Sequence, residues 1–237
     1  MSYSKTADSY DGFVQLCSGY GGYNPGSPNL TLSALYELAG KARDALQATY
    51  VAKSAMKEAT NQREITFAGL QKLVSGISFA LAASGASEQT MKDIRVFLRQ
   101  MSSRKKGRDP IPSDQSTEPV KPNRPFSQRG YEAMANQFAE LVQMVNRQPN
   151  YRPNEAHLSK AGLQEMVKQL HGHNQAVRDA RAAFSHARVA LHQVFYDDAQ
   201  SIVATARAAK KYLRSVFGLN SNEYSQVRKI QFTKSYL

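Results

Sequence analysis

The sequence has no tryptophan and a single cysteine, Cys17. One thiol cannot form an internal disulfide, so a disulfide-stapled secreted scaffold is excluded and a reducing compartment is favoured. No lysine, arginine or histidine lies near Cys17 in the sequence to stabilise a thiolate. This surrounding favours a small core residue over a reactive thiol.

Long apolar runs are also scarce. The first residues, 1–13, lack the basic start and the apolar stretch of a secretory signal. The most apolar later run, Ile77 to Ala83, is far shorter than the ~20 residues that span a bilayer. We therefore expect a cytoplasmic protein without a membrane partner.

Metal-binding patterns are missing as well. A zinc pair on a helix needs two ligands three or four residues apart. The histidines have other spacings, and all five lie in the second half of the chain, at His157, His171, His173, His186 and His192. The sequence predicts neither a metal site nor a cofactor.

The sequence motifs of common enzymes do not occur. There is no Walker phosphate loop, no dinucleotide glycine fingerprint and no G-x-S-x-G elbow. Asp197 and Asp198 are adjacent at a break between expected helices, where carboxylates are natural N-caps. Asn220, followed three residues later by Glu223, similarly resembles a capping box at the start of the last expected helix. We expect a non-catalytic protein, with a triad dispersed along the sequence as the alternative.

Apolar residues at helical spacing fill most of the chain. One such pattern runs from Leu35 to Ala59 and another from Leu163 to Phe195, and neither contains proline. Each predicts a helix of roughly 35 residues, about 50 Å long at 1.5 Å per residue. Shorter helices are expected before and after each long one. The predicted fold class is all-α, built from helical bundles.

Two stretches 128 positions apart share one pattern. They read YNPGSPNLT, from Tyr23, and YRPNEAHLS, from Tyr151. Thr31 and Ser159, which end them, are expected to be N-caps of the long helices, with the preceding leucines packed as hydrophobic staples. The same spacing aligns Phe67 with Phe195.

Further matches extend this alignment. Val74 falls on Ile202, and after a five-residue insertion Gly85 falls on Gly218, where each glycine is expected to end a helix. The ordered set of matches predicts an internal duplication. We expect two tandem helical-bundle units related by pseudo-twofold symmetry.

A proline-rich segment separates the two copies. Residues 102–128 hold five of the nine prolines, a spacing that no helix survives. The sequence therefore predicts a first helical unit at 1–101, a basic linker at 102–128 and a second helical unit at 129–237.

Five segments have distinctive amino-acid sequences. They are Arg63–Phe67, Leu81–Ser87, Glu118–Lys121, Tyr151–Glu155 and Ser215–Lys234. Because of these five segments, the chain resembles, over nearly its whole length, a family of uncharacterised, duplicated all-helical proteins of Bacteroidetes-type bacteria. The resemblance implies a bacterial source, but it brings no activity and no catalytic residue.

The net charge of +12 is unevenly distributed. Residues 1–100 carry ten basic and eight acidic side chains, residues 101–130 seven and three, and residues 131–237 fourteen and eight. Such an excess of cations raises association rates with polyanions. A solvated surface is the alternative explanation.

The excess is concentrated in short basic clusters, which are the candidate polyanion-binding residues. They are Arg104, Lys105, Lys106, Arg108, Lys121, Arg124, Arg129, Lys210, Lys211, Arg214, Arg228 and Lys229. No recognition helix or stacking platform for reading bases is evident. We expect binding of nucleic acid, or another polyanion, without strong sequence specificity. The alternative is a structural, self-assembling scaffold or particle-associated protein with a protein partner and no nucleic-acid role.

Overall fold

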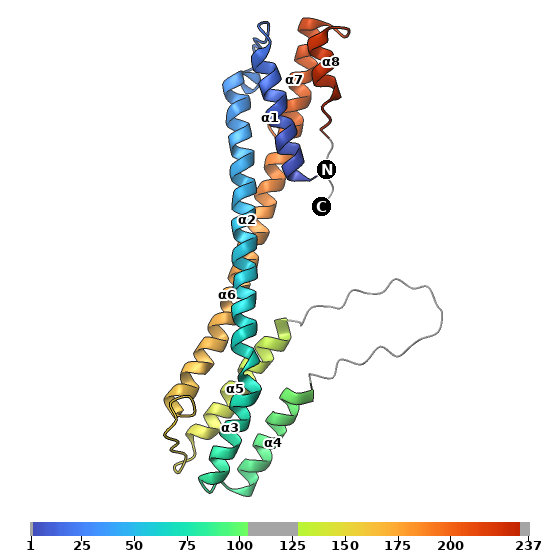
Figure 1. The fold of residues 1–237 in the computed structure, drawn as a ribbon. Helices are drawn as coiled ribbons and strands as arrows, with labels where there is room; N and C mark the ends of the chain where they lie inside the picture. The colour runs from blue at the N-terminus through green and yellow to red at the C-terminus, as the bar shows by residue number, and fades with distance from the viewer. Residues whose placement is uncertain (1, 104–127, 233–237) are drawn as a thin grey trace, which may run out of the picture. The chain divides into compact units, whose positions relative to one another are not determined.

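The computed structural model of this 237-residue chain describes residues 2–103 and 128–232. Side chains are described for residues 2–98 and 130–232. All regular elements in these ranges are helices, so the predicted all-α class is confirmed (Figure 1). Most of the predicted linker, residues 104–127, lies outside the described residues.

The helices follow one another in the order of their labels. They are α1 (Tyr3–Gly19), the 3-10 turn η1 (Pro28–Leu30), α2 (Leu32–Ala68), α3 (Leu70–Ala83), α4 (Glu88–Ser103), α5 (Gln128–Asn146), α6 (Lys160–His192), the π-helical turn η2 (Gln193–Asp197), α7 (Ile202–Phe217) and α8 (Asn222–Lys229). The two long helices that the sequence predicts are α2, with 37 residues, and α6, with 33.

The chain forms two compact units. Unit 1 comprises Met1–Met56 and Ala180–Leu237, and unit 2 comprises Lys57–Asp179. The long helices α2 and α6 therefore each contribute one part to each unit. This division differs from the sequence-based boundaries at 1–101 and 129–237, because helices pair across the proline-rich segment rather than within one sequence half.

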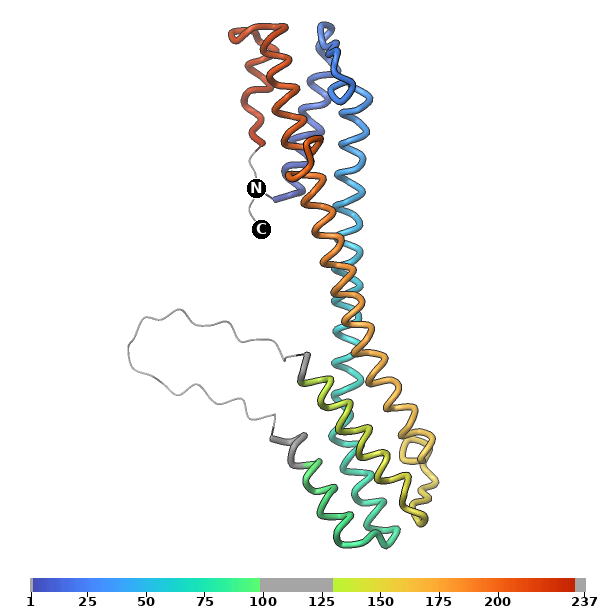
Figure 2. The backbone as a smooth tube through the Cα atoms, turned by 180° about the vertical axis from the view of Figure 1, so that it is seen from behind, coloured from blue at the N-terminus to red at the C-terminus, as the bar shows by residue number. Residues whose placement is uncertain are grey.

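Unit 1 has a core made from both ends of the chain. Tyr10 and Phe13 of α1 are fully buried, and so are Phe195 of η2 and Leu213 of α7. Figure 2 shows the corresponding blue and red segments running side by side within this unit. The last described residue, Phe232, closes the core, with its ring 5.8 Å from that of Phe13.

Unit 2 has a second core with the same kind of pairing. Buried residues of α3, such as Ile77 and Leu81, share one apolar cluster with Phe138 and Leu141 of α5 and with Leu163 of α6. The rings of Phe67 in α2 and Tyr131 in α5 lie 4.9 Å apart, edge to face. Burying several such side chains, each contributing about 1.5–3 kcal/mol, supplies the main stabilising term of the unit.

The capping predictions for the long helices are confirmed. The Thr31 hydroxyl accepts a hydrogen bond from the Ala34 N–H at 3.3 Å, and the Ser159 hydroxyl accepts one from the Gly162 N–H at 3.1 Å. The tyrosine that opens each stretch is buried. The Tyr23 hydroxyl donates to the carbonyl of Leu30 at 2.7 Å, and the Tyr151 hydroxyl donates to that of Leu158 at 2.8 Å. Each stretch is thus closed by a hydrogen bond to the residue before the cap.

Replacing Thr31 with alanine is expected to lower the free energy of unfolding by about 1 kcal/mol, because a first-turn amide of α2 loses its hydroxyl acceptor. Thr31→Ser keeps the hydroxyl and is expected to stay close to the parent. Urea denaturation followed by far-UV circular dichroism measures both. Equal losses for the two variants would contradict the capping role.

The predicted helix ends are partly confirmed. Gly85 and Gly218 have the positive φ angles, 73° and 87°, that favour glycine at a helix end. The caps of the last two helices are not where the sequence placed them. Ser201, and not Asp197 or Asp198, caps α7, and Ser221 caps α8 in place of Asn220.

The π-helical turn explains the first of these corrections. It continues α6 through Asp197, so the break begins at Asp198 and ends at Ser201. Phe195 and Tyr196 are buried in this turn. Asp198 instead accepts a hydrogen bond from the Gln200 N–H at 3.1 Å, inside the short connection to α7.

One helical stretch is apolar over a longer range than the sequence run suggested. Within Leu32–Ala83, a window of 18 residues has a mean hydropathy of 1.4, which suffices by length and composition to cross a membrane, and 28% of that window is buried. The mean hydropathy of a window stays high when a few polar residues interrupt it, whereas an uninterrupted apolar run ends at the first of them. Leu70, Val74 and Ile77 of this stretch lie in the core of unit 2, and core helices of soluble proteins have similar composition. The absence of a membrane partner stays a prediction.

Candidate functional site

The last two helices form a hairpin that carries most of the described basic clusters. Helix α7 begins at its Ser201 cap and ends at Gly218, whose N–H donates to the carbonyl of Arg214 at 3.1 Å. The Ser221 hydroxyl donates to the Gly218 carbonyl at 3.2 Å and caps α8. The turn between the two helices is therefore fixed by hydrogen bonds at both ends.

Buried residues and cations occupy different sides of α7. Ala206, Ala209 and Leu213 are buried in the core of unit 1. Arg207, Lys211 and Arg214 are exposed and follow one another at spacings of four and three, which places them on one face of the helix. On α8, Arg228 and Lys229 are also exposed.

We refer to these five exposed side chains as the basic face; they are Arg207, Lys211, Arg214, Arg228 and Lys229. Within the part of the chain that the structure describes, none of the five forms an ion pair. Glu223 is the single acidic residue between positions 199 and 232, against six basic ones. The hairpin therefore has a strongly positive and largely uncompensated surface.

Lys210 has a different role from its neighbours. Its ammonium donates a hydrogen bond to the carbonyl of Ile230 and lies 5.1 Å from the centre of the Phe232 ring. Burial lowers the pKa of this lysine. Lys210 therefore holds the segment after α8 against α7 and is not an available surface cation.

Arg207 was missed by the sequence reasoning, although its spacing of four from Lys211 was a usable signal. Its guanidinium donates to the carbonyl of Phe232 at 3.3 Å and keeps most of its donors for solvent. Because residues 230 and 232 contact Lys210 and Arg207, the C-terminal end of α8 lies beside the middle of α7. Arg228 and Lys229 therefore lie on the part of the hairpin that packs beside the middle of α7.

The structure describes only one of the remaining predicted polyanion-binding residues. Arg129 lies in α5, where its backbone alone is described. The others lie outside the described residues: Arg104, Lys105, Lys106, Arg108, Lys121 and Arg124. Of the predicted set, the structure therefore exposes Lys211 and Arg214 on one face of α7 and Arg228 and Lys229 on α8 of the same hairpin.

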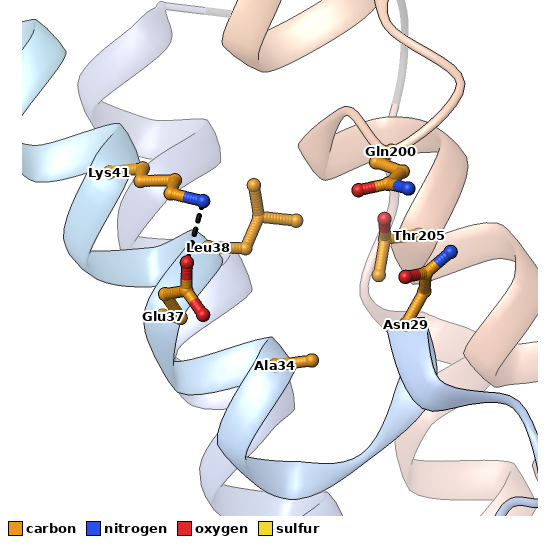
Figure 3. A pocket seen from close by; sticks show the side chains of 7 residues that line it. All are labelled: Asn29, Ala34, Glu37, Leu38, Lys41, Gln200 and Thr205. Carbon is orange, nitrogen blue, oxygen red and sulfur yellow. Dashed lines mark ion pairs between the residues drawn. The ribbon is translucent and has the colours of Figure 1, made fainter.

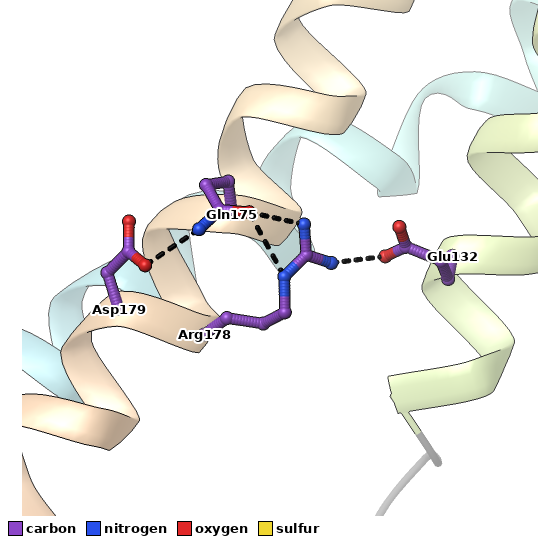
Figure 4. A network of polar contacts seen from close by, with 4 residues as sticks. All are labelled: Glu132, Gln175, Arg178 and Asp179. Carbon is purple, nitrogen blue, oxygen red and sulfur yellow. Dashed lines mark hydrogen bonds and ion pairs between the residues drawn. The ribbon is translucent and has the colours of Figure 1, made fainter.

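Several arginines elsewhere are committed to contacts inside their own unit. In unit 2, Arg178 pairs with Glu132 at 2.8 Å, which joins α6 to α5 (Figure 4). Gln175 accepts two hydrogen bonds from the same guanidinium, at 2.5 and 3.2 Å, and donates to Asp179 at 2.7 Å. In unit 1, the forked guanidinium of Arg43 meets both oxygens of Asp11 at 2.7 and 3.0 Å. Such cations are neutralised locally, unlike those of the basic face.

A small polar pocket lies in unit 1 between the start of α2 and the connection to α7 (Figure 3). Its volume of about 120 Å³ is below the 300–1,000 Å³ typical of small-ligand sites. Glu37 on its wall pairs with Lys41 at 2.6 Å, and this hydrogen bond lowers the pKa of the carboxyl group. A carboxylate held ionised on an exposed helix is a poor general base at neutral pH.

In the described ranges, potential nucleophiles and metal ligands do not form a second candidate site. Burial raises the pKa of the Cys17 thiol to about 12, so the thiol stays protonated and enclosed at neutral pH, as the sequence predicts. Among the described residues, no three His, Cys, Asp or Glu side chains converge as metal ligands. His192 is half-buried, with its Nε2 3.2 Å from Asp197 and its Nδ1 2.9 Å from the Tyr3 hydroxyl.

Comparison of the chain with protein-family models, with curated proteins and with solved structures finds no match. Evidence about function therefore comes from the residues and their arrangement. The basic face is the described feature with the clearest chemical meaning, because a cluster of unpaired cations is suited to bind a polyanion.

Proposed function

We propose that this chain is a non-catalytic, cytoplasmic protein that binds a polyanion, in the first place nucleic acid, without strong sequence specificity. The observation that carries the proposal is the basic face. It has five exposed cations on one hairpin, and none of them forms an ion pair with a carboxylate of the described residues. Neutralised cations such as Arg43 and Arg178 show that this chain elsewhere pairs its charges when a carboxylate is in reach.

The physical basis is the release of counterions. Each phosphate that a lysine or arginine neutralises frees condensed cations, and this entropy gain drives binding regardless of base sequence. Base-specific reading needs side chains that reach groove edges or aromatic platforms for stacked bases. The cations of α7 and α8 supply charge alone, which supports binding to the phosphate backbone.

The basic residues whose side chains the structure does not describe belong to the same proposal. Arg104, Lys105, Lys106 and Arg108 follow α4 directly in sequence, and Lys121, Arg124 and Arg129 precede or begin α5. Four cations within five residues present enough charge to contact several phosphates. We propose that these clusters add contacts to those of the basic face.

Binding to random-sequence duplex and single-stranded nucleic acid, followed by fluorescence anisotropy from low to physiological salt, tests the function. The expected result is binding at low salt that weakens steeply as salt rises, by about 0.9 in log affinity per log salt for each neutralised phosphate of a duplex. Absence of binding at the lowest salt would remove the proposal. Strong preference for one sequence would contradict its non-specific character.

A structural, self-assembling scaffold is the second candidate, and it rests on recurrence along the chain. We propose an internal duplication with pseudo-twofold symmetry, supported by the matching hydrogen bonds of Tyr23 and Tyr151. The buried positions of α3 also match buried positions of α7 at a separation of 132 residues. This separation is four residues longer than the 128 residues by which the sequence aligned Val74 with Ile202. These pairs are Leu70 and Ile202, Val74 and Ala206, Ile77 and Ala209, and Leu81 and Leu213.

Repeated units can make repeated contacts with copies of the same protein or with a larger particle. Light scattering over a range of protein concentrations separates the two functions. A mass that rises with concentration, without affinity for nucleic acid, favours the scaffold. A constant monomer mass together with salt-dependent nucleic-acid binding favours the polyanion-binding function.

A further inference from the structure

Unit 1 contains a second cavity, distinct from the basic face and larger than the polar pocket. Its volume is about 310 Å³, within the range typical of small-ligand sites. Three elements line it: the first residues of α1, the middle of α2 and the last part of α6 that belongs to this unit. The cavity is therefore built where the N-terminal part of the chain meets the last part of α6.

The floor of this cavity is apolar and well supported. Leu191 is almost fully buried, and Leu46, Phe184 and the ring of Tyr3 contribute further apolar surface. The Thr49 hydroxyl lies within hydrogen-bonding distance of two carbonyls, 2.8 Å from that of Ala45 and 3.3 Å from that of Ala187 on α6. This contact ties α2 to α6 at the floor, so the cavity is held open by packed helices.

The charged residues that line the cavity are both cations. They are Lys53 of α2 and Arg188 of α6, and no carboxylate lines the cavity. Neither cation forms an ion pair with a residue in the described ranges. The Arg188 guanidinium lies 5.9 Å from the centre of the Phe184 ring, which keeps its head group at the cavity.

The acidic group that acts on Tyr3 of the cavity wall is already engaged. Asp197 lies 3.2 Å from His192 Nε2, and the other ring nitrogen of that histidine meets the Tyr3 hydroxyl. Burial and, next, Tyr196 raise the pKa of Tyr3, while the charge of Arg188 acts in the opposite direction and more strongly than that of Asp197. Ser2, Tyr3 and Ser4 also place the positive end of the 17-residue helix α1 at the rim.

We infer that this cavity binds a small amphipathic anion, in which a short acyl chain or one aromatic ring lies on the apolar floor. Its carboxylate, or an anionic group of similar size, binds Arg188 and Lys53 at the rim. Arginine offers a forked pair of donors that matches a carboxylate, and lysine adds a point charge. The exposed ring of Tyr50, also at the rim, covers the ligand from the solvent side.

Isothermal titration of the full chain with octanoate tests this inference, with 1-octanol and octylammonium as probes of equal chain length. Octanoate is expected to bind at least about tenfold more tightly than octanol, because a charge-assisted hydrogen bond is lost with the carboxylate. Octylammonium is expected to bind less tightly than octanol, since both cations of the rim repel it. Absence of octanoate binding, or equal affinity for all three probes, would overturn the inference.

Two variants locate the site. Arg188 is exposed, and the Arg188→Gln variant is expected to lower octanoate affinity about tenfold. The control variant Arg181→Gln changes an exposed arginine on the same helix but outside the cavity, and it is expected to leave octanoate affinity unchanged. Leu46→Trp fills the cavity and is expected to abolish binding of both octanoate and octanol. Circular dichroism of each variant checks that the helices are kept. Octanoate binding that survives both Arg188→Gln and Leu46→Trp unchanged would place the ligand elsewhere and refute the site.

Discussion

Replacing all five cations of the basic face with glutamine is expected to lower nucleic-acid affinity by more than about tenfold at 50 mM salt. The reason is that up to five phosphates lose their partners and keep their counterions. The log–log salt slope on duplex is expected to flatten by about 4.5 when all five contacts are lost. Fluorescence anisotropy on one random duplex, with parent and variant measured side by side, gives both quantities.

A matched control separates the basic face from net charge. The control variant changes five exposed cations of unit 2 to glutamine and so lowers the net charge equally; they are Lys57, Lys72, Arg95, Arg147 and Arg152. We expect this variant to keep most of the affinity and most of the salt slope. If both variants lost affinity equally, the protein would bind through its overall charge and the basic face would have no special role.

Separated halves of the chain are expected to be unfolded, and mixed halves are expected to fold together. The polypeptides 1–101 and 129–237 each contain only one side of both cores. Leaving four large core side chains exposed costs about 6–12 kcal/mol, which equals the whole stability of a typical domain. Circular dichroism of each half and of the equimolar mixture measures the effect.

Size-exclusion chromatography with light scattering provides the complementary readout. The mixture is expected to elute as a complex containing one copy of each half, with a cooperative melting transition that neither half has alone. A half that melts cooperatively as a monomer would contradict the pairing of helices across the sequence halves. It would favour the sequence-based boundaries at 1–101 and 129–237 instead.

Features that depend on a few neighbouring residues could be predicted from the sequence. A cap involves a hydroxyl and an amide three residues apart, so Thr31 and Ser159 were identifiable without knowing the fold. The stops at Gly85 and Gly218 follow from backbone sterics in the same way. The two long helices followed from apolar periodicity.

Features that depend on distant partners could not be predicted in this way. An apolar stripe shows that a helix face is covered, but it does not show which helix covers it. Tyr23 illustrates this limit: its burial could be expected, but its edge-to-face contact with Tyr212 could not. For the same reason the sequence could not separate Lys210, which holds the chain end, from Lys211, which faces solvent.

The caps of α7 and α8 show a third kind of limit. Several cap-forming residues stand close together before each helix, and the sequence does not choose among them. The π-helical turn moves the break beyond Asp197, which leaves Ser201 at the cap position. Ser221 similarly takes the place that Asn220 could have filled.

The most direct measurement of the central claim, that both cores join residues from the two sequence halves, is a nuclear Overhauser spectrum of the aromatic rings. We predict cross-peaks between Tyr23 and Tyr212, whose ring centres lie 5.4 Å apart, and between Phe67 and Tyr131, at 4.9 Å. Cross-peaks confined to rings within 1–101 or within 129–237, with both of these pairs silent, would contradict the account.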